Sequence, residues 1–283
     1  MTDAVNAAAA GTIEIGGDMV VRRMGFGAMR ITGEGIWGNP RDLDQARATL
    51  RKVVELGVNF IDTADAYGPD VSEELIAEAL HPYPEDLVIA TKGGLLRPGP
   101  GVWNEDGRPE HLREACEGSL RRLRLEQIPL YQFHRPDSNV PMEESLGMLV
   151  QLKDEGKIRH IGVSNVSEEQ LRTAQKVTPV VSVQNRYNVT DRHSDAVLDV
   201  CELEEIVFLP WAPIQQTDNP AVTEAARRHG ASPRQIVLAW LLARSSHMLP
   251  IPGTGSPGHA ADNIAAASIT LDDDEYHAIA GDA

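Results

Sequence analysis

Three polar residues, an acid, a base and an imidazole, stand at or near the ends of short apolar segments of the chain. Asp62 ends one segment, Lys92 the next and His134 the one after that, and Tyr67 lies five residues beyond Asp62. A tyrosine with the ordinary pKa of about 10 is a poor acid at pH 7. A nearby ammonium stabilises the phenolate. We therefore expect Lys92 to lower the pKa of Tyr67 and to make this phenol a proton donor.

The other two side chains complete the chemistry. Asp62 would hold the ammonium of Lys92, and His134 would orient a substrate carbonyl. A phenol beside a carbonyl site suits protonation of a developing alkoxide. Side chains donate no hydride, so a reduction at this site would require a nicotinamide cofactor. Singly, each residue also has a plain structural interpretation as a loop cap, a turn residue or a packed aromatic, and the hypothesis depends on their occurring together.

A second group of residues suits such a cofactor. Ser164, Asn165 and Gln184 carry the hydroxyl and amide groups that a carboxamide needs as partners, and Trp211 offers a flat face for stacking. Thr254 and Ser256 precede a predicted helix, whose free N–H groups can bind phosphate, although Ser256 followed by proline is also an ordinary helix start. The histidines show no spacing typical of metal ligands, and we expect no metal site.

Short apolar segments alternate with amphipathic ones about eight times. The predicted strands are Arg23–Gly25, Asn59–Asp62, Leu87–Thr91, Ile128–Phe133, His160–Ser164, Val180–Gln184, Ile206–Leu209 and Met248–Ile251. The predicted helices are Asp42–Leu56, Ser72–Leu80, Glu110–Leu123, Met142–Glu155, Glu168–Lys176, Asp195–Glu202, Pro220–His229, Pro233–Ala243 and Gly258–Ala267. Such alternation is typical of βαβ units with a parallel sheet.

The pattern predicts an α/β fold, a (β/α)8 TIM barrel, forming a single domain over residues 1–283. An N-terminal β-hairpin over Thr12–Val21, after a flexible head of residues 1–10, would precede it. An open doubly wound sheet is the competing fold, but its G-x-G-x-x-G fingerprint is broken by Arg30 at the third glycine position. In a barrel the polar strand ends listed above meet at one mouth.

Composition excludes several classes of function. The chain has 283 residues, with 26 Lys+Arg against 42 Asp+Glu, and a net charge of −16. This charge argues against nucleic-acid partners and anionic membrane surfaces, so an anionic ligand must be held by a local site. The sequence has no apolar run long enough to span a bilayer, and Cys116 and Cys201 lack CxxC spacing. Because residues 1–10 show neither a basic nor an apolar signal region, we expect no secretory signal. We expect a cytoplasmic protein with reduced thiols.

Three segments resemble signatures of the aldo-keto reductase superfamily. They are NFIDTADAYG at 59–68, YQFHRPD at 131–137 and GKIRHIGVSN at 156–165. The resemblance implies a barrel that reduces aldehydes or ketones with NADPH, with Asp62, Tyr67, Lys92 and His134 as catalytic tetrad and Tyr67 as general acid. Within the superfamily the chain is most similar to a short bacterial branch, some of whose members are pyridoxal reductases.

The resemblance also implies a cofactor seat. Its residues would be Gly27, Ala28, Met29, Asp62, Ser164, Asn165, Gln184, Trp211, Pro213, Ile214, Thr254, Ser256, His259, Asp262 and Asn263. Many relatives carry Lys and Arg, which grip the 2′-phosphate of NADPH, where this chain has Gly253 and His259, so NADH is not excluded. Trp37, Tyr67 and His134 would line the substrate pocket.

Two other functions fit parts of this pattern. A barrel that holds a nicotinamide as a redox sensor and regulates a partner would retain the cofactor with little turnover. A barrel enzyme that uses Lys92 as a Schiff-base amine would form a covalent adduct that borohydride traps. The physiological substrate, the direction of the reaction and the oligomeric state are left open by the sequence.

Overall fold

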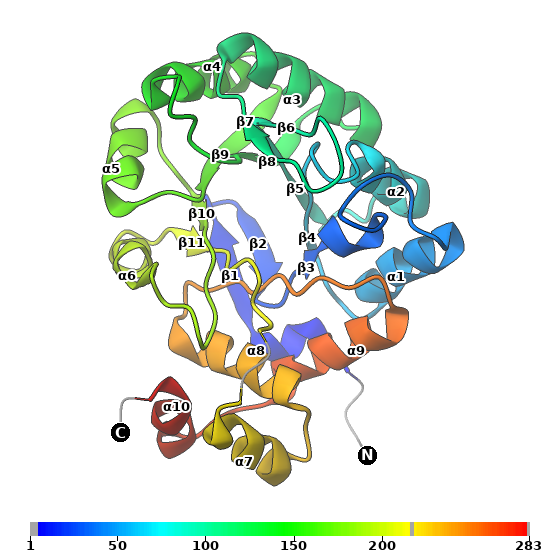
Figure 1. The fold of residues 1–283 in the computed structure, drawn as a ribbon, viewed down its shortest axis with the longest axis vertical. Helices are drawn as coiled ribbons and strands as arrows, with labels where there is room; N and C mark the ends of the chain where they lie inside the picture. Colours follow the sequence, from blue (N-terminus) through cyan, green and yellow to red (C-terminus); the bar gives the residue numbers. More distant parts are fainter. Residues whose placement is uncertain (1–4, 216–217, 282–283) are drawn as a thin grey trace.

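A parallel sheet of seven strands curls into a barrel surrounded by helices (Figure 1). The computed structural model describes residues 5–215 and 218–281. In pairing order the strands are β3 (Phe26–Gly27), β4 (Phe60–Asp62), β5 (Val88–Gly93), β8 (Ile128–Phe133), β9 (Ile158–Ser164), β10 (Ser182–Gln184) and β11 (Val207–Phe208). The predicted (β/α)8 architecture is confirmed. The first strand lies three residues later than predicted, at Phe26 instead of Arg23.

Residues 248–252 take the place of the eighth strand. Met248 bridges Phe208 of β11 in parallel, and the amides of Gly25 and Gly27 donate to the carbonyls of Pro250 and Pro252 at 2.9 and 3.5 Å. The predicted strand Met248–Ile251 is therefore in place but is not a regular strand. Proline lacks the N–H that a continuous ladder of hydrogen bonds needs. Pro250 and Pro252 occupy alternate positions of this segment, on the side that faces β3.

The helices lie close to the positions predicted from the sequence. They are α1 (Leu43–Glu55), α2 (Val71–Leu80), α3 (Pro109–Leu123), α4 (Met142–Asp154), α5 (Glu168–Val177), α6 (Asp195–Leu203), α7 (Pro220–His229), α8 (Pro233–Arg244), α9 (Pro257–Ala265) and α10 (Asp273–Ala280). The capping boxes at Ser167 and Ser232 form as their sequences indicate. Helix α10 was not predicted, although Asp272 and Glu275 make a capping box there too. It packs on α7 outside the ring (Figure 1).

The N-terminal hairpin closes one end of the barrel. Strand β1 (Thr12–Ile15) pairs antiparallel with β2 (Met19–Arg22), and Figure 1 shows both across the barrel axis. Ile15, Met19 and Val21 are buried in one cluster with apolar side chains of the barrel strands. Within the first ten residues, Ala7–Ala10 form a 3-10 helix with Ala7 buried, and residues 1–4 lie outside the described part. The hairpin thus covers this end of the barrel and not the opposite one.

A second, unpredicted hairpin lies at that opposite end. Strand β6 (Leu95–Leu96) pairs with β7 (Asn104–Glu105) in the loop between β5 and α3. It places Trp103 beside Tyr67, with ring centroids 6.4 Å apart in an edge-to-face arrangement. Across the described residues, none of the helices is both long and apolar enough to span a membrane.

Candidate active site

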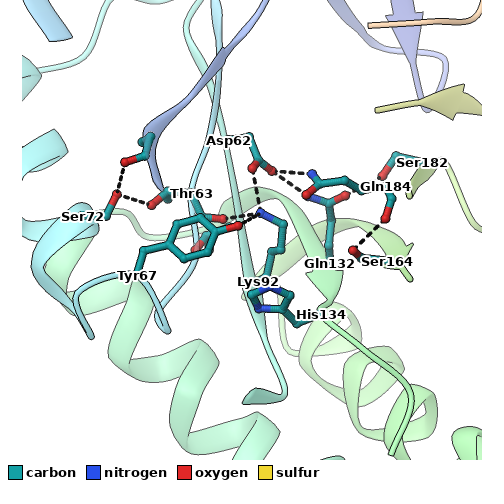
Figure 2. Close-up of polar contacts among 12 residues, drawn as sticks. Asp62, Thr63, Tyr67, Ser72, Lys92, Gln132, His134, Ser164, Ser182 and Gln184 are labelled. Carbon is teal, nitrogen blue, oxygen red and sulfur yellow. Dashed lines mark hydrogen bonds and ion pairs between the residues drawn. The ribbon is translucent and has the colours of Figure 1, made fainter. Parts of the chain in front are cut away.

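The tetrad predicted from the sequence comes together at the carboxyl ends of three neighbouring strands. Asp62 ends β4, Lys92 lies near the end of β5, and His134 directly follows β8. Tyr67 reaches in from the loop after β4. Figure 2 shows the ammonium of Lys92 between the carboxylate of Asp62 and the phenol of Tyr67.

Asp62 is buried and both of its oxygens are used. Oδ2 accepts from Nζ of Lys92 at 2.7 Å. Oδ1 accepts from the side-chain amides of Gln132, at 3.1 Å, and Gln184, at 2.7 Å. A buried carboxylate needs such hydrogen-bond partners, and the two glutamines and the lysine together supply them and fix the orientation of Asp62.

Lys92 is fully buried, and its ammonium has three oxygen neighbours. Besides Asp62, Nζ donates to the carbonyl of Thr63 at 2.8 Å and to the phenol oxygen of Tyr67 at 3.3 Å. Burial opposes the charged form, but the carboxylate of Asp62 and the neighbouring phenol outweigh it and the pKa of Lys92 is raised. Because a Schiff base requires a neutral amine, this geometry argues against Lys92 as a nucleophile.

Tyr67 keeps its proton more firmly than the sequence led us to expect. Burial raises its pKa above the ordinary 10.0, Lys92 lowers it, and Asp62 raises it again. The expectation of a net lowering by Lys92 is therefore wrong, because desolvation of the phenolate is the larger effect. Lys92 still faces the oxygen on which negative charge forms when the proton leaves, so its contribution is to stabilise the phenolate.

His134 is buried and neutral. Burial, followed by the positive charges of Lys92, Arg135 and Arg97, lowers the pKa of His134 well below its usual range. Its ring meets that of Tyr67 edge to face at 5.9 Å between centroids. A neutral imidazole carries one N–H donor; it can hydrogen-bond a carbonyl oxygen without adding a charge.

Three members of the tetrad, Asp62, Tyr67 and His134, line a cavity of about 510 Å³. Eleven residues predicted for the cofactor or substrate line it: Gly27, Met29, Asp62, Tyr67, His134, Ser164, Asn165, Gln184, Trp211, Pro213 and Ile214. This volume lies in the usual range for small-molecule sites. Lys92 lies beneath the surface of the cavity and reaches it only through Tyr67 and Asp62.

The predicted carboxamide partners form a connected polar wall. Ser164 Oγ donates to the carbonyl of Gln184 at 2.8 Å, and Asn165 Nδ2 donates to Ser164 Oγ at 3.0 Å. Asn165 adopts a left-handed backbone conformation (φ 58°), which asparagine tolerates. In it, Oδ1 of Asn165 accepts from the indole N–H of Trp211 at 3.0 Å. The wall is thus fixed in place before any ligand arrives.

Several predicted residues do not line this cavity. They are Ala28, Trp37, Thr254, Ser256, His259, Asp262 and Asn263. Ser256 caps α9 by accepting from the amide of His259 at 3.4 Å, so the ordinary helix start is present. Trp37 is half-buried and pairs with Gly68 instead of facing the cavity. The phosphate site at this helix stays a prediction.

The lining residues that were not predicted for the site include Arg30, Leu95, Trp103 and Arg135. Leu95 and Trp103 belong to the unpredicted hairpin, and Arg97 supports the indole of Trp103 from 3.5 Å. Arg30 and Arg135 bring positive charge to the mouth. The sequence offers a signal only for Arg135, which adjoins His134. In the described residues, no cluster of side chains suited to a metal ion was found.

Comparisons with known proteins agree with this geometry. A family model described as the Aldo/keto reductase family matches residues 23–281. The chain belongs to this family. An uncharacterized oxidoreductase of Schizosaccharomyces pombe is 47% identical, over 97% of this chain and 90% of that protein. Pyridoxine 4-dehydrogenase of Escherichia coli is 37% identical, over 94% of this chain and 96% of that protein.

A solved structure is also similar to this aldo-keto reductase. It is an aldo-keto reductase from Klebsiella pneumoniae in complex with NADPH, which is 26% identical. The alignment covers 95% of this chain and 93% of that one, with a TM-score of 0.79. Membership in the family makes the protein an oxidoreductase of carbonyl compounds.

Proposed function

We propose that this aldo-keto reductase reduces an aldehyde or ketone to an alcohol with NADPH, and that Tyr67 supplies the proton. The observation that carries the proposal is the ammonium of Lys92, held at 2.7 Å from Asp62 and at 3.3 Å from the phenol oxygen of Tyr67. A buried cation at this oxygen stabilises the phenolate that remains after proton transfer. A carbonyl accepting a hydride becomes an alkoxide and needs that proton.

The residues present fit a nicotinamide cofactor. The donor set of the polar wall matches a carboxamide: Gln184 donates through its nitrogen to Asp62, and its amide oxygen accepts no hydrogen bond from the described residues. Trp211, held by Asn165, offers the aromatic face. When bound, the nicotinamide would supply the hydride. NADPH is supported by the solved relative in complex with it, whereas Gly253 and His259 leave NADH open.

The protein's own residues perform the rest of the reaction. His134, neutral, donates a hydrogen bond to the substrate carbonyl and orients it toward Tyr67. Tyr67 then transfers its phenolic proton to the oxygen, and Lys92 stabilises the phenolate. In the oxidation direction the same phenolate accepts the proton of the alcohol. Gln132 and Gln184 keep Asp62 in place so that the ammonium does not turn away.

Steady-state assays test this proposal. Purified protein is mixed with NADPH or NADH and a panel of aldehydes that includes pyridoxal, chosen because one relative is a pyridoxine 4-dehydrogenase. Consumption of the reduced nicotinamide is followed by its absorbance. We expect turnover that depends on both substrates, with NADPH preferred. Tight cofactor binding without turnover for any aldehyde would overturn the reductase proposal in favour of a sensor.

A further inference from the structure

Arg97 is a buried cation beside the cavity to which the proposed mechanism gives no role. It directly follows β6, and only 8% of the residue is exposed. Its guanidinium has no carboxylate partner among the described residues, and its three hydrogen bonds there all go to main-chain carbonyls. A buried charge is costly unless it gains strong partners. The segments that carry these carbonyls therefore indicate what the arginine does.

The three carbonyls belong to three separate segments at the end of the barrel that carries the cavity. Nη1 of Arg97 donates at 2.9 Å to Ala66, the residue directly before the proposed proton donor. Nε donates at 2.9 Å to Val102, the residue directly before Trp103. Nη2 donates at 3.2 Å to Gly35. One side chain thus joins the loop of the proton donor, the β6–β7 hairpin and the loop after the first barrel strand.

The guanidinium also packs on two indole rings. Its Cζ lies 3.5 Å from the ring centroid of Trp103 and 5.6 Å from that of Trp37. A guanidinium near an aromatic face is attracted by the charge distribution of the ring. Trp103 lines the cavity and meets Tyr67 edge to face, whereas Arg97 does not line the cavity. Arg97 therefore reaches the contents of the cavity through Trp103.

The hairpin depends on Arg97 more than the loop of Tyr67 does. The amide of Tyr67 donates to the carbonyl of Ala64 at 3.2 Å, and its carbonyl accepts from the amide of Ser72 at 3.0 Å. Residues 97–103, in contrast, form a turn between two strands of two residues each and contain two prolines and two glycines. Loss of the guanidinium should therefore release Trp103 and leave Tyr67 in place.

We propose that Arg97 is a positioning residue that holds Trp103 at the cavity and so sets the affinity for the carbonyl substrate. The inference rests on the proposed function, because it concerns the substrate of that reaction. The planar guanidinium directs several donors at once, whereas a lysine ammonium acts as a point charge. Because Tyr67 and Lys92 keep their places, the signature of a lost Arg97 is a higher KM at an unchanged kcat.

Steady-state kinetics with benzaldehyde at saturating NADPH test this inference. Arg97→Met keeps an unbranched stem without the donors, and Arg97→Lys keeps the charge without the planar fork. Arg23→Met is the matched control. Arg23 also donates to three main-chain carbonyls, but it directly follows β2 of the N-terminal hairpin and does not line the cavity. Circular dichroism establishes that each variant is folded.

We expect Arg97→Met to raise KM for benzaldehyde about 3–10-fold, the effect of one aromatic contact, while kcat and the Arg23→Met control stay at the wild-type values. Arg97→Lys should resemble Arg97→Met, which separates positioning from the effect of the Arg97 charge on the pKa of His134. The double variant Arg97→Met with Trp103→Ala should have the KM of Trp103→Ala alone, because effects that pass through one contact do not add.

Hydrogen exchange followed by mass spectrometry tests the positioning without turnover. Residues 97–103 should exchange faster in Arg97→Met than in the wild type or in Arg23→Met. Unchanged exchange in this turn would overturn the inference.

The kinetic outcomes separate the inference from the proposed function. If the wild type reduces benzaldehyde and Arg97→Met has the same KM, or if its effect adds to that of Trp103→Ala, Arg97 does not act through Trp103 while the proposed function stands. If the wild type turns over none of the aldehydes, the proposed function fails and the role of Arg97 fails with it.

Discussion

Gln184 Nε2 lies 2.7 Å from Oδ1 of Asp62, and this contact joins the polar wall to the side of the cavity that carries Tyr67. Gln132 donates to the same oxygen, so the other oxygen of Asp62 is left for Lys92. The carboxylate cannot rotate without losing a partner. The ammonium is consequently aimed at the phenol of Tyr67 by a chain of contacts that begins on β10.

Removal of the phenol oxygen should abolish proton donation while leaving binding intact. For Tyr67→Phe we expect kcat/KM for aldehyde reduction to fall by about 10²–10⁴, the range for loss of a general acid. The dissociation constant of NADPH should change little. Both are measured on the same preparation, and equal reduction rates for wild type and variant would remove Tyr67 from the mechanism.

Loss of Lys92 should cost both activity and stability. Lys92→Met leaves the buried charge of Asp62 without its cation, and breaking a buried pair from one side costs about 3–5 kcal/mol. Urea denaturation measures this loss. The double variant Lys92→Met with Asp62→Asn removes both charges and should regain much of the stability but none of the activity. A single variant as stable as the wild type would show that the pair is not coupled.

The pH dependence of reduction should be flat around neutrality. Reduction needs the protonated form of Tyr67, and burial raises its pKa, so the proton stays on through pH 8 and beyond. The pKa of His134 is lowered well below 6.5, so the imidazole is neutral above that pH. We expect kcat/KM to be constant between pH 6.5 and 8.5 and to fall only at higher pH. An inflection near pH 7 that His134→Gln abolishes would contradict a neutral imidazole.

Trp103 should favour aromatic substrates. Its ring meets that of Tyr67 edge to face and is backed by Arg97. Trp103→Ala should raise KM for benzaldehyde about 3–10-fold, because an aromatic pair contributes about 0.5–1.5 kcal/mol, and should change KM for propanal little. Trp103→Phe keeps a ring and serves as the control. The same change in KM for both aldehydes would indicate a general distortion of the cavity.

Both thiols should be inert in the folded protein. Burial raises the pKa of Cys116 and of Cys201 to about 12, and the thiolate is the reactive form. Ellman's reagent is expected to label neither cysteine under native conditions and two per chain in denaturant. Rapid labelling of either in the native state would place that thiol at the surface, against its position on the inner face of its helix.

The repeating architecture and the tetrad could be predicted from the sequence because local signals coincide with them. Ile128–Phe133 is a strand of mostly apolar residues, and its bounds were predicted to the residue. The seam at 248–252 was predicted as a strand, but Pro250 and Pro252 prevent regular pairing. The small hairpin that carries Trp103 was missed, since its strands have only two residues each and no alternation is visible over that length.

The balance between burial and neighbouring charge that sets the pKa of Tyr67 was the hardest part of the site to predict from the sequence. A rule about neighbouring charges predicts the direction in which Lys92 acts on Tyr67, and that direction is correct. It does not include the cost of burying the phenolate, which depends on how closely the loops cover Tyr67. Likewise, the carbonyls that Arg97 contacts belong to segments far apart in the chain, and only the closed barrel brings them together.

Pro250 and Pro252, which face β3, also make one part of the barrel less strongly hydrogen-bonded than its surroundings. Between β3 and residues 248–252, the amides of Gly25 and Gly27 donate to carbonyls of prolines, which return no N–H of their own. On the other side of the same segment, the amide of Phe208 donates to the carbonyl of His247 at 2.8 Å and the amide of Leu249 donates back to the carbonyl of Phe208 at 2.9 Å. We therefore expect the contact between β3 and residues 248–252, next to Arg30, to open before the other strands of the sheet separate. Amide hydrogen exchange at Gly25 and Gly27 should report this opening.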